Sequence, residues 1–487
     1  MMFNLDSTAF LDSFSVDKMS INSALRTSDC GHLVKVDIHL RNSPLQGSAQ
    51  TYVQSFATGE TIEGIVSIVP QDDLAFDKLH ISFTGEQSTS IPSSTPSKAT
   101  HQFLHLIQPL PESSLPNPKI FARRTKYDIP FSFPVTDYLP ATACPHSSHP
   151  LVKAAHLHPP PSLGDATIAG FGGRLRDDLA PEDGCKIVYT IIARLERPNP
   201  TSGIQETIME RRVKVRIKPH VGETPLPDLD LGRALEGEYS LFQDGVVRTS
   251  STKKGGGRLA VTLEKPKCFW HPLGDTVRLI SKAVRLTLVY TPSASSAGGP
   301  AQAGSSPATT PALPEIKSLR AQITATTLYT TQINAPHHPP QKRRDFFGRP
   351  INYRDAEIPL SLPSLPQLRW TRVQGNQDHR QISSPNPGSE HGPNSPSPPP
   401  VAQPATETGV VSYVATVLVP VTLTKDKSFV PTFHSCLISR IYSLSFQLDV
   451  KGASTSFKLR VPMTIVAERD PAALPSYNAS LGVIETD

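Results

Sequence analysis

The sequence predicts an all-β protein in which two β-sandwich domains are interrupted by inserts rich in proline and serine. Apolar and polar residues alternate along many short segments, a pattern that buries one face of a strand and leaves the other in water. No segment carries an apolar stripe of helical period over the length of an ordinary helix. Turn residues separate the short segments, as is typical of sandwiches and barrels.

The alternating segments fall into two sets, and each set predicts one domain. The first set covers residues 62–68, 79–83, 127–133, 189–195 and 213–217. The second set covers residues 259–263, 284–290, 319–323, 413–419, 444–450 and 457–465. One short helix is expected near Pro150 to His156.

Composition shifts along the chain predict the domain boundaries. The stretch between the two sets is rich in Asp, Glu and Gly and ends in KKGGGR, which is typical of a connection. We expect an N-terminal extension, a first sandwich, an interdomain connection, a second sandwich and a tail, at residues 1–34, 35–220, 221–255, 256–468 and 469–487. Two inserts of the second sandwich, residues 291–312 and 374–408, lack periodic apolar residues, and we expect them to be disordered.

The charge balance argues against a dedicated nucleic-acid binder. The chain has 48 basic and 43 acidic residues, a net charge of +5. This small excess is compatible with weak attraction to an anionic membrane surface, but it does not form the basic patch that nucleic acids require. We therefore expect no nucleic-acid partner.

Cysteine usage and hydropathy predict a cytoplasmic protein. The five cysteines form no C-x-x-C pair, which favours a reducing compartment over a disulfide framework. The first residues, MMFNLDSTAFLDSF, contain acids and no apolar core of a secretory signal. The longest apolar stretch, residues 410–421, is far shorter than the roughly 20 residues that a membrane helix needs.

No motif of a known catalytic site is present in the sequence. A G-x-S-x-G elbow, a P-loop and an H-E-x-x-H helix are all missing. We therefore expect a protein that is not an enzyme and that needs no cofactor.

One cluster of cysteine and histidine has the residue types of a metal site. Zinc takes about four nitrogen or sulfur ligands in a tetrahedron. The spacing here matches no common zinc finger, so we favour a crossover loop whose histidines bond to the backbone, and we expect no metal. The weak candidates for metal ligands are Cys144, His146, His149, His156 and His158.

One predicted strand has an outer face made of basic residues. They alternate with Val213, Val215 and Ile217, which should face the core. The basic face either binds an anionic partner, such as a phosphorylated tail or lipid head groups, or is an ordinary solvated face, and we favour the second interpretation. The basic residues are Arg212, Lys214, Arg216 and Lys218.

The tail contains a ligand motif for WW domains. Residues 474–477 read LPSY and fit the pattern [L/P]-P-x-Y, with Leu474, Pro475 and Tyr477 as its defining residues. Proline pre-forms a polyproline II turn, which an aromatic-lined groove binds at low entropic cost. Because the motif follows the last predicted strand, we expect it to be exposed.

Several stretches resemble the arrestin family. Residues 58–68, TGETIEGIVSI, are similar to an arrestin strand of pattern G-E-x-I-x-G-x-V, and residues 76–85, FDKLHISFTG, to the strand that follows it. Residues 127–133, YDIPFSF, resemble the Y-x-x-P-F-x-F strand, and residues 160–165 with 187–191 resemble the loop and strand after it. Residues 429–442, which begin FVPTFHSC, look like a late segment of fungal arrestin-like proteins.

The resemblance implies a fold, a function and partners. The fold would be two tandem immunoglobulin-like, arrestin-like β-sandwiches. The α-arrestin branch links integral membrane cargo to a HECT-type ubiquitin ligase through PY motifs, for ubiquitination and endocytic sorting. In this sequence the residues that match such a PY motif are Leu474, Pro475 and Tyr477. Leu474 stands where the family more often has proline. Such an adaptor would be cytoplasmic and recruited peripherally to the plasma membrane or endosomes.

Two other functions remain open at this point. A ligase-independent trafficking or signalling scaffold on the same fold would not need Tyr477. An immunoglobulin-like DNA-binding regulator would use the basic strand to contact phosphates, but the modest net charge argues against it.

Limited proteolysis tests the predicted inserts. Residues 291–312 and 374–408 bury too little apolar surface to offset their ordering entropy, so a protease should cut there first. Mass spectrometry of the fragments should locate the first cuts in these two stretches and leave the flanking strands intact. Early cuts confined to other parts of the chain would contradict the prediction.

Overall fold

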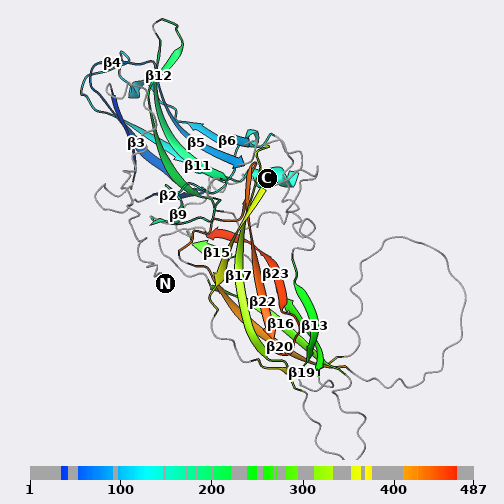
Figure 1. Cartoon of the computed structure of the whole chain (residues 1–487). Coiled ribbons are helices and arrows are strands. Elements are labelled where there is room, and N and C mark those ends of the chain that lie inside the picture. Colours follow the sequence, from blue (N-terminus) through cyan, green and yellow to red (C-terminus); the bar gives the residue numbers. More distant parts are fainter. Residues whose placement is uncertain are drawn as a thin grey trace, which may run out of the picture.

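The computed structural model describes much of the chain, and the regular structure in these parts is almost all β-strand (Figure 1). Most of both predicted inserts, nearly all of residues 1–34 and the whole tail 469–487 lie outside the described residues. The described residues are 34–41, 53–91, 97–145, 150–171, 174–181, 184–199, 201–220, 239–248, 256–266, 269–272, 281–293, 312–332, 352–362, 368–375, 410–424 and 426–468.

The N-terminal unit, residues 34–220, contains two sheets that face each other. One has the order β1-β3-β8 and the other β2-β12-β11-β5-β6, in which β2 runs parallel to β12. Two short pairs, β4 with β7 and β9 with β10, flank them. The strands are β1 (Val34–Leu40), β2 (Ser55–Ala57), β3 (Thr61–Pro70), β4 (Leu74–Ala75), β5 (Lys78–Ile91), β6 (Ser97–Ile107), β7 (Ile120–Phe121), β8 (Tyr127–Pro134), β9 (Gly170–Phe171), β10 (Arg174–Leu175), β11 (Cys185–Pro198) and β12 (Gln205–Lys218).

The helices of the described chain are short. The expected helix is confirmed as α1 (Pro150–His156), and two 3-10 turns, η2 (Glu112–Ser114) and η3 (Ala141–Ala143), lie in the same unit. Within the parts that the structure covers, no helix has the length and apolarity that crossing a bilayer requires.

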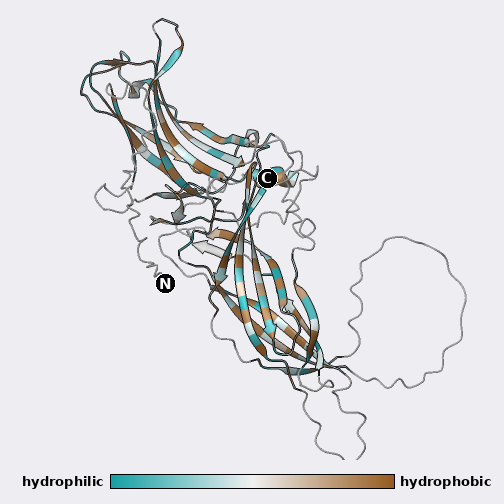
Figure 2. Ribbon diagram, viewed as in Figure 1, coloured by the Kyte–Doolittle hydropathy of each residue, from teal (hydrophilic) through white to brown (hydrophobic). Residues whose placement is uncertain are grey.

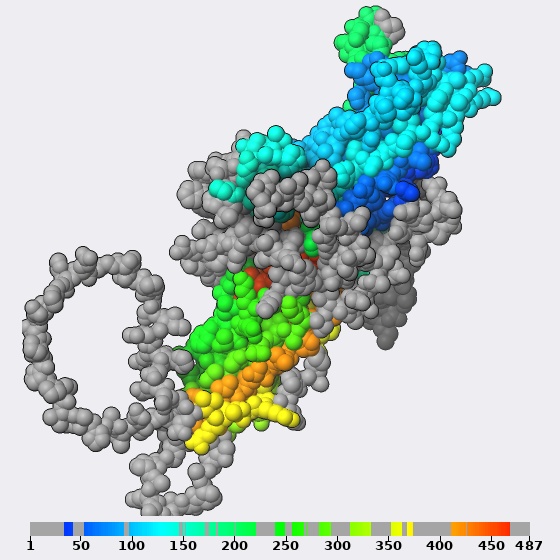
Figure 3. Space-filling model, turned by 180° about the vertical axis from the view of Figure 1, so that it is seen from behind, coloured from blue at the N-terminus to red at the C-terminus, as the bar shows by residue number. Residues whose placement is uncertain are grey.

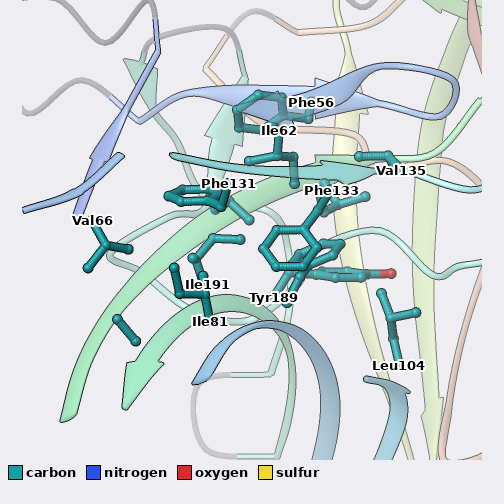
Figure 4. Packing of buried hydrophobic residues seen from close by; sticks show 14 of the residues in the cluster. Phe56, Ile62, Val66, Ile81, Leu104, Phe131, Phe133, Val135, Tyr189 and Ile191 are labelled. Atoms are coloured by element: carbon teal, nitrogen blue, oxygen red, sulfur yellow. The ribbon is translucent and has the colours of Figure 1, made fainter. Parts of the chain in front are cut away.

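The core of the N-terminal unit follows from the period-two alternation of its strands. Inward side chains of β3 and β8 meet those of β5 and β11, and Figure 4 shows the rings of Phe131, Phe133 and Tyr189 among them. Phe131 packs directly over Gly64, its cross-strand partner. A Cβ at Gly64 would lie 2.5 Å from the Phe131 ring and 2.5 Å from the His39 carbonyl oxygen. Glycine is therefore required there by close packing.

The C-terminal unit, residues 239–468, repeats this arrangement around a second core. One sheet has the order β13-β14-β16-β20-β19 and the other β18-β17-β22-β21, with β23 also paired to β22; β15 pairs with β24. Apolar and polar residues alternate along the strands of both units (Figure 2). The strands are β13 (Phe242–Arg248), β14 (Gly256–Leu263), β15 (Phe269–Pro272), β16 (Ser281–Pro292), β17 (Ile316–Tyr329), β18 (Asn352–Leu360), β19 (Thr371–Gly375), β20 (Val410–Thr422), β21 (Phe433–His434), β22 (Ile438–Val450), β23 (Phe457–Met463) and β24 (Ile465–Glu468).

One expected boundary needs correction. Residues 221–255 were expected to connect the domains, but Phe242–Arg248 within them forms β13 and pairs with β14 along its whole length. β13 is the outermost strand of its sheet, and Val247 is its one fully buried side chain. An edge strand with so little buried surface has a weak apolar pattern, which explains why the sequence resembles a connection.

The two units lie end to end (Figures 1 and 3). A segment of the second unit is built into the core of the first. We call residues 429–438, which include β21 and the turn into β22, the junction segment. Its side chains Val430, Phe433, Leu437 and Ile438 belong to the core of the N-terminal unit. The described parts of the chain therefore form two sandwich-like units that share buried surface.

Gly64→Ala should destabilise the protein by about 1–3 kcal/mol, the usual effect of overpacking a core. The added Cβ meets backbone as well as the Phe131 ring, so the strand itself must shift. Urea unfolding followed by tryptophan fluorescence and circular dichroism measures the change. Gly245→Ala is the matched control, because its Cβ would approach the tip of the Phe457 ring at 3.3 Å. Equal unfolding midpoints for the two variants would contradict the packing argument.

Candidate functional site

The junction segment is held by a buried glutamine of the N-terminal unit. Gln87, on β5, is 1% exposed. Its side-chain oxygen accepts hydrogen bonds from the Ser435 hydroxyl at 2.7 Å and from the Leu437 amide at 3.3 Å. Buried polar groups must be paired, and this carboxamide supplies the acceptor for the Leu437 amide. The Ser435 hydroxyl also lies 2.7 Å from the Ile438 carbonyl oxygen, so the two acceptors share it.

A buried arginine crosses the same interface. Arg440, on β22, has no exposed surface, and it donates hydrogen bonds to the carbonyl oxygens of Asp178 and Leu179, both at 3.1 Å. Leu179 has a φ of +60°, a conformation that is strained for leucine. The Arg440 guanidinium and the Asp177 carboxylate, which accepts the Leu179 amide at 2.8 Å, hold this backbone in place.

The acidic residues beside Leu179 differ in their surroundings. Burial raises the pKa of Asp178, although amide donors and the Arg440 charge oppose this effect. Burial acts in the same direction on Asp177, but the hydrogen bond from Lys427, at 2.9 Å, lowers its pKa below the usual value. Asp177 therefore forms a charged link between the units at the surface, while Asp178 lies within the buried junction.

The basic strand β12 is not the continuous solvated face that its sequence predicts. Arg212 and Lys214 have side chains 47% and 44% exposed and pair with Glu210 and Asp165. Arg216 and Lys218 are only 2% and 6% exposed, so the expectation is wrong for them.

The covering of Arg216 explains this correction. Its guanidinium donates to the carbonyl oxygens of Ile168 and Ala169 and to the Ser55 hydroxyl, so the loop before β9 and strand β2 lie over it. Lys218 and Arg216 line a small cleft with Ser428, Phe429 and Ala467 of the C-terminal unit. Alternation identifies the outer face of a strand, but it does not show whether another layer covers that face.

The cysteine and histidine candidates are divided by the fold. Cys144 and His156 come together, with the Cys144 sulfur 3.4 Å from His156 Nδ1. His158 lies apart, with its ring tilted against that of Tyr138 at a centroid distance of 4.7 Å, and burial lowers its pKa. His146 and His149 lie outside the described residues.

A third ligand-type residue joins Cys144 and His156. Cys436, in the junction segment, completes a buried group in which the three ligand atoms all lie within 4.8 Å of one another. A hydrogen bond to Cys144 and burial raise the pKa of the Cys436 thiol well above its usual value. Sequence reasoning missed Cys436 because it is far from Cys144 in the chain and has no neighbouring cysteine.

The sequence also gave little indication of Arg440 and Gln87. The one available signal was an arginine next to Ile441 within residues 438–448, which are otherwise uncharged, where a charge must be buried if the strand is covered on both faces. The Leu474, Pro475 and Tyr477 motif lies outside the described residues. No protein-family model and no curated protein matches this chain.

Gln87→Ala should lower the free energy of unfolding by about 1–3 kcal/mol, because the Leu437 amide then stays buried without an acceptor. Urea unfolding of the full chain measures this. Gln102→Ala, an exposed position on the neighbouring strand β6, is the matched control and should change stability by less than about 0.5 kcal/mol. A Gln87→Ala protein as stable as the control would show that the junction does not depend on this contact.

Proposed function

We propose that this chain is a non-catalytic, arrestin-like adaptor that links membrane cargo to a HECT-type ubiquitin ligase for ubiquitination and endocytic sorting. The observation that carries the proposal is the position of the resembling stretches in the fold. Residues 58–68, 76–85 and 127–133 contribute β3, β5 and β8 to the N-terminal unit. Residues 429–442 contain the junction segment and enter the same core. The resemblance therefore falls on the residues that build one unit and join it to the other.

The tight junction between the units supports an adaptor more than a hinge-driven device. Buried contacts made by Gln87, Arg440 and the junction segment keep the two units at a fixed spacing. A protein that holds two partners together gains from such rigidity, because the second partner binds in a geometry that the first has already set.

Recruitment to the plasma membrane or endosomes then depends mainly on cargo. The basic strand contributes little, because Arg216 and Lys218 are buried and Arg212 and Lys214 pair with acids. The same burial weakens the alternative of a DNA-binding regulator, since that strand would have to contact phosphates.

The tail should bind WW domains of a HECT-type ligase, and Tyr477 should carry much of the affinity. One proline and one aromatic anchor make a small interface, so we expect dissociation constants of roughly tens of micromolar, about −6 to −7 kcal/mol. Tyr477→Ala should weaken binding by about 2 kcal/mol, since it removes an interface anchor. Calorimetric titration of the full-length protein with isolated WW domains measures both values.

Two further variants sharpen the experiment. Leu474→Pro should tighten binding because a second proline stiffens the polyproline II turn, and Pro475→Ala should weaken it less than Tyr477→Ala does. Tyr138→Ala, at an exposed tyrosine remote in sequence from the tail, is the control and should bind as the wild type does. In cells, Tyr477→Ala should reduce the ubiquitination of this protein, and its cargo should stay at the membrane. Coincident titration curves for wild type and Tyr477→Ala would favour the ligase-independent scaffold instead.

A further inference from the structure

Three buried side chains with metal-ligand chemistry meet at the junction between the units. Cys144, His156 and Cys436 are 0%, 3% and 2% exposed. The Cys144 sulfur and His156 Nδ1 are 3.4 Å apart, and the Cys436 sulfur lies within 4.8 Å of both. Two thiols and an imidazole make a soft donor set that suits zinc better than magnesium or calcium.

The separation between Cys144 Sγ and His156 Nδ1 is close to that in a tetrahedral zinc site. With Zn–S bonds of about 2.3 Å and Zn–N bonds of about 2.0–2.1 Å, neighbouring ligand atoms lie about 3.5–3.8 Å apart. The observed 3.4 Å between Cys144 Sγ and His156 Nδ1 differs from this by about a tenth of an ångström. The Cys436 sulfur, which lies within 4.8 Å of both, would have to move closer to reach the same separation.

Each ligand sits on a separate, well-held element. Cys144 directly follows the η3 turn, and His156 ends α1, whose residue Ala155 is fully buried. Cys436 lies in the turn between β21 and β22, which the hydrogen bond from the Ser435 amide to the Ile438 carbonyl closes at 2.9 Å. Because the backbone already fixes all three positions, binding an ion would require little ordering of the chain.

The geometry points to a zinc site formed by Cys144, His156 and Cys436 that fastens the C-terminal unit to the N-terminal unit. On binding, Zn²⁺ replaces the two thiol protons, which leave to solvent, and the imidazole binds through Nδ1. A ligand from outside these three completes the tetrahedron. The site goes beyond the adaptor function, since it would support the junction whether or not the protein binds a ligase.

The metal content of the full-length protein, purified under reducing conditions without chelator, tests the site. Elemental analysis should find about one zinc per chain in the wild type. The variants Cys436→Ser and His156→Ala should contain no zinc. Their affinity for Zn²⁺ should fall by more than the roughly 10- to 100-fold that is typical when a residue hydrogen-bonded to a ligand is changed. Cys185→Ser is the matched control, because this free thiol is also buried but lies outside the cluster, and it should keep its zinc.

Two additional measurements separate lost binding from lost folding. His156→Cys supplies a third thiolate at the same position and should restore zinc binding that His156→Ala loses. Cobalt(II) added to metal-free wild type should produce thiolate charge-transfer absorption, which Cys436→Ser should lack. Chelation should lower the unfolding midpoint of the wild type by on the order of 5 °C, and that of Cys436→Ser not at all.

Three results would overturn the site. The first is wild-type protein that neither contains zinc nor takes it up from added Zn²⁺. The second is Cys436→Ser protein that keeps its zinc, which would place the ion elsewhere. The third is a Cys144–Cys436 disulfide, found by mass spectrometry as the loss of two hydrogens, in protein isolated from cells with thiols blocked. Binding of WW domains to the tail is measured separately, so failure of the zinc site leaves the adaptor proposal intact.

Discussion

The burial of the junction segment inside the core of the N-terminal unit is the constraint on which the rest of the structure depends. Val430, Phe433, Leu437 and Ile438 precede or open a strand of the C-terminal unit, yet they pack with the other unit. Withdrawing them would expose apolar surface and also break the Gln87 contacts with the turn. The two units are therefore expected to unfold together, although each has a core of its own.

Charged residues at the junction set the orientation of the units more than they add stability. Removing a guanidinium from water is expensive, and carbonyl partners compensate for it only when the geometry is good. Two nitrogens of Arg440 have that geometry towards the Asp178 and Leu179 carbonyl oxygens of the other unit, while its Nε has no hydrogen-bond partner among the described residues. A rotated arrangement of the units would leave the Arg440 charge buried without these two acceptors, so the observed arrangement is favoured over its alternatives.

The sequence predicted the strands better than it predicted their surroundings. Inward and outward faces differ in polarity wherever a single sheet borders water. Alternation therefore located β3, β5, β8, β11 and β12, and in the C-terminal unit β14, β16, β17, β20, β22 and β23. It failed at Arg216 and Lys218, where a loop and the other unit cover the outward face. It also failed at β13, an edge strand with a single fully buried side chain. Alternation of apolar and polar residues identifies a strand. Whether another part of the chain covers the outer face of that strand depends on the tertiary structure.

The candidate metal site shows the same limit in chemical terms. Local spacing groups Cys144 with four histidines, but only His156 of the described members reaches it. The remaining ligand, Cys436, comes from the junction segment, and nothing near it in sequence marks it as a partner. Ligands that are brought together by the docking of two units cannot be counted before that docking is known. For this reason the spacing of these residues in the sequence argued against zinc, while their arrangement in the folded chain favours it.

The junction segment links the stability of the protein to anything that binds there. Its turn carries Ser435, which bonds to Gln87, and Cys436, which faces Cys144 and His156, on consecutive residues. An ion held by Cys436 would stabilise the docked segment, and a correctly docked segment is what brings the three ligands within reach of one ion. The two equilibria are therefore coupled, and by linkage each strengthens the other by the same factor. Such coupling would make the docking of the junction segment depend on the metal.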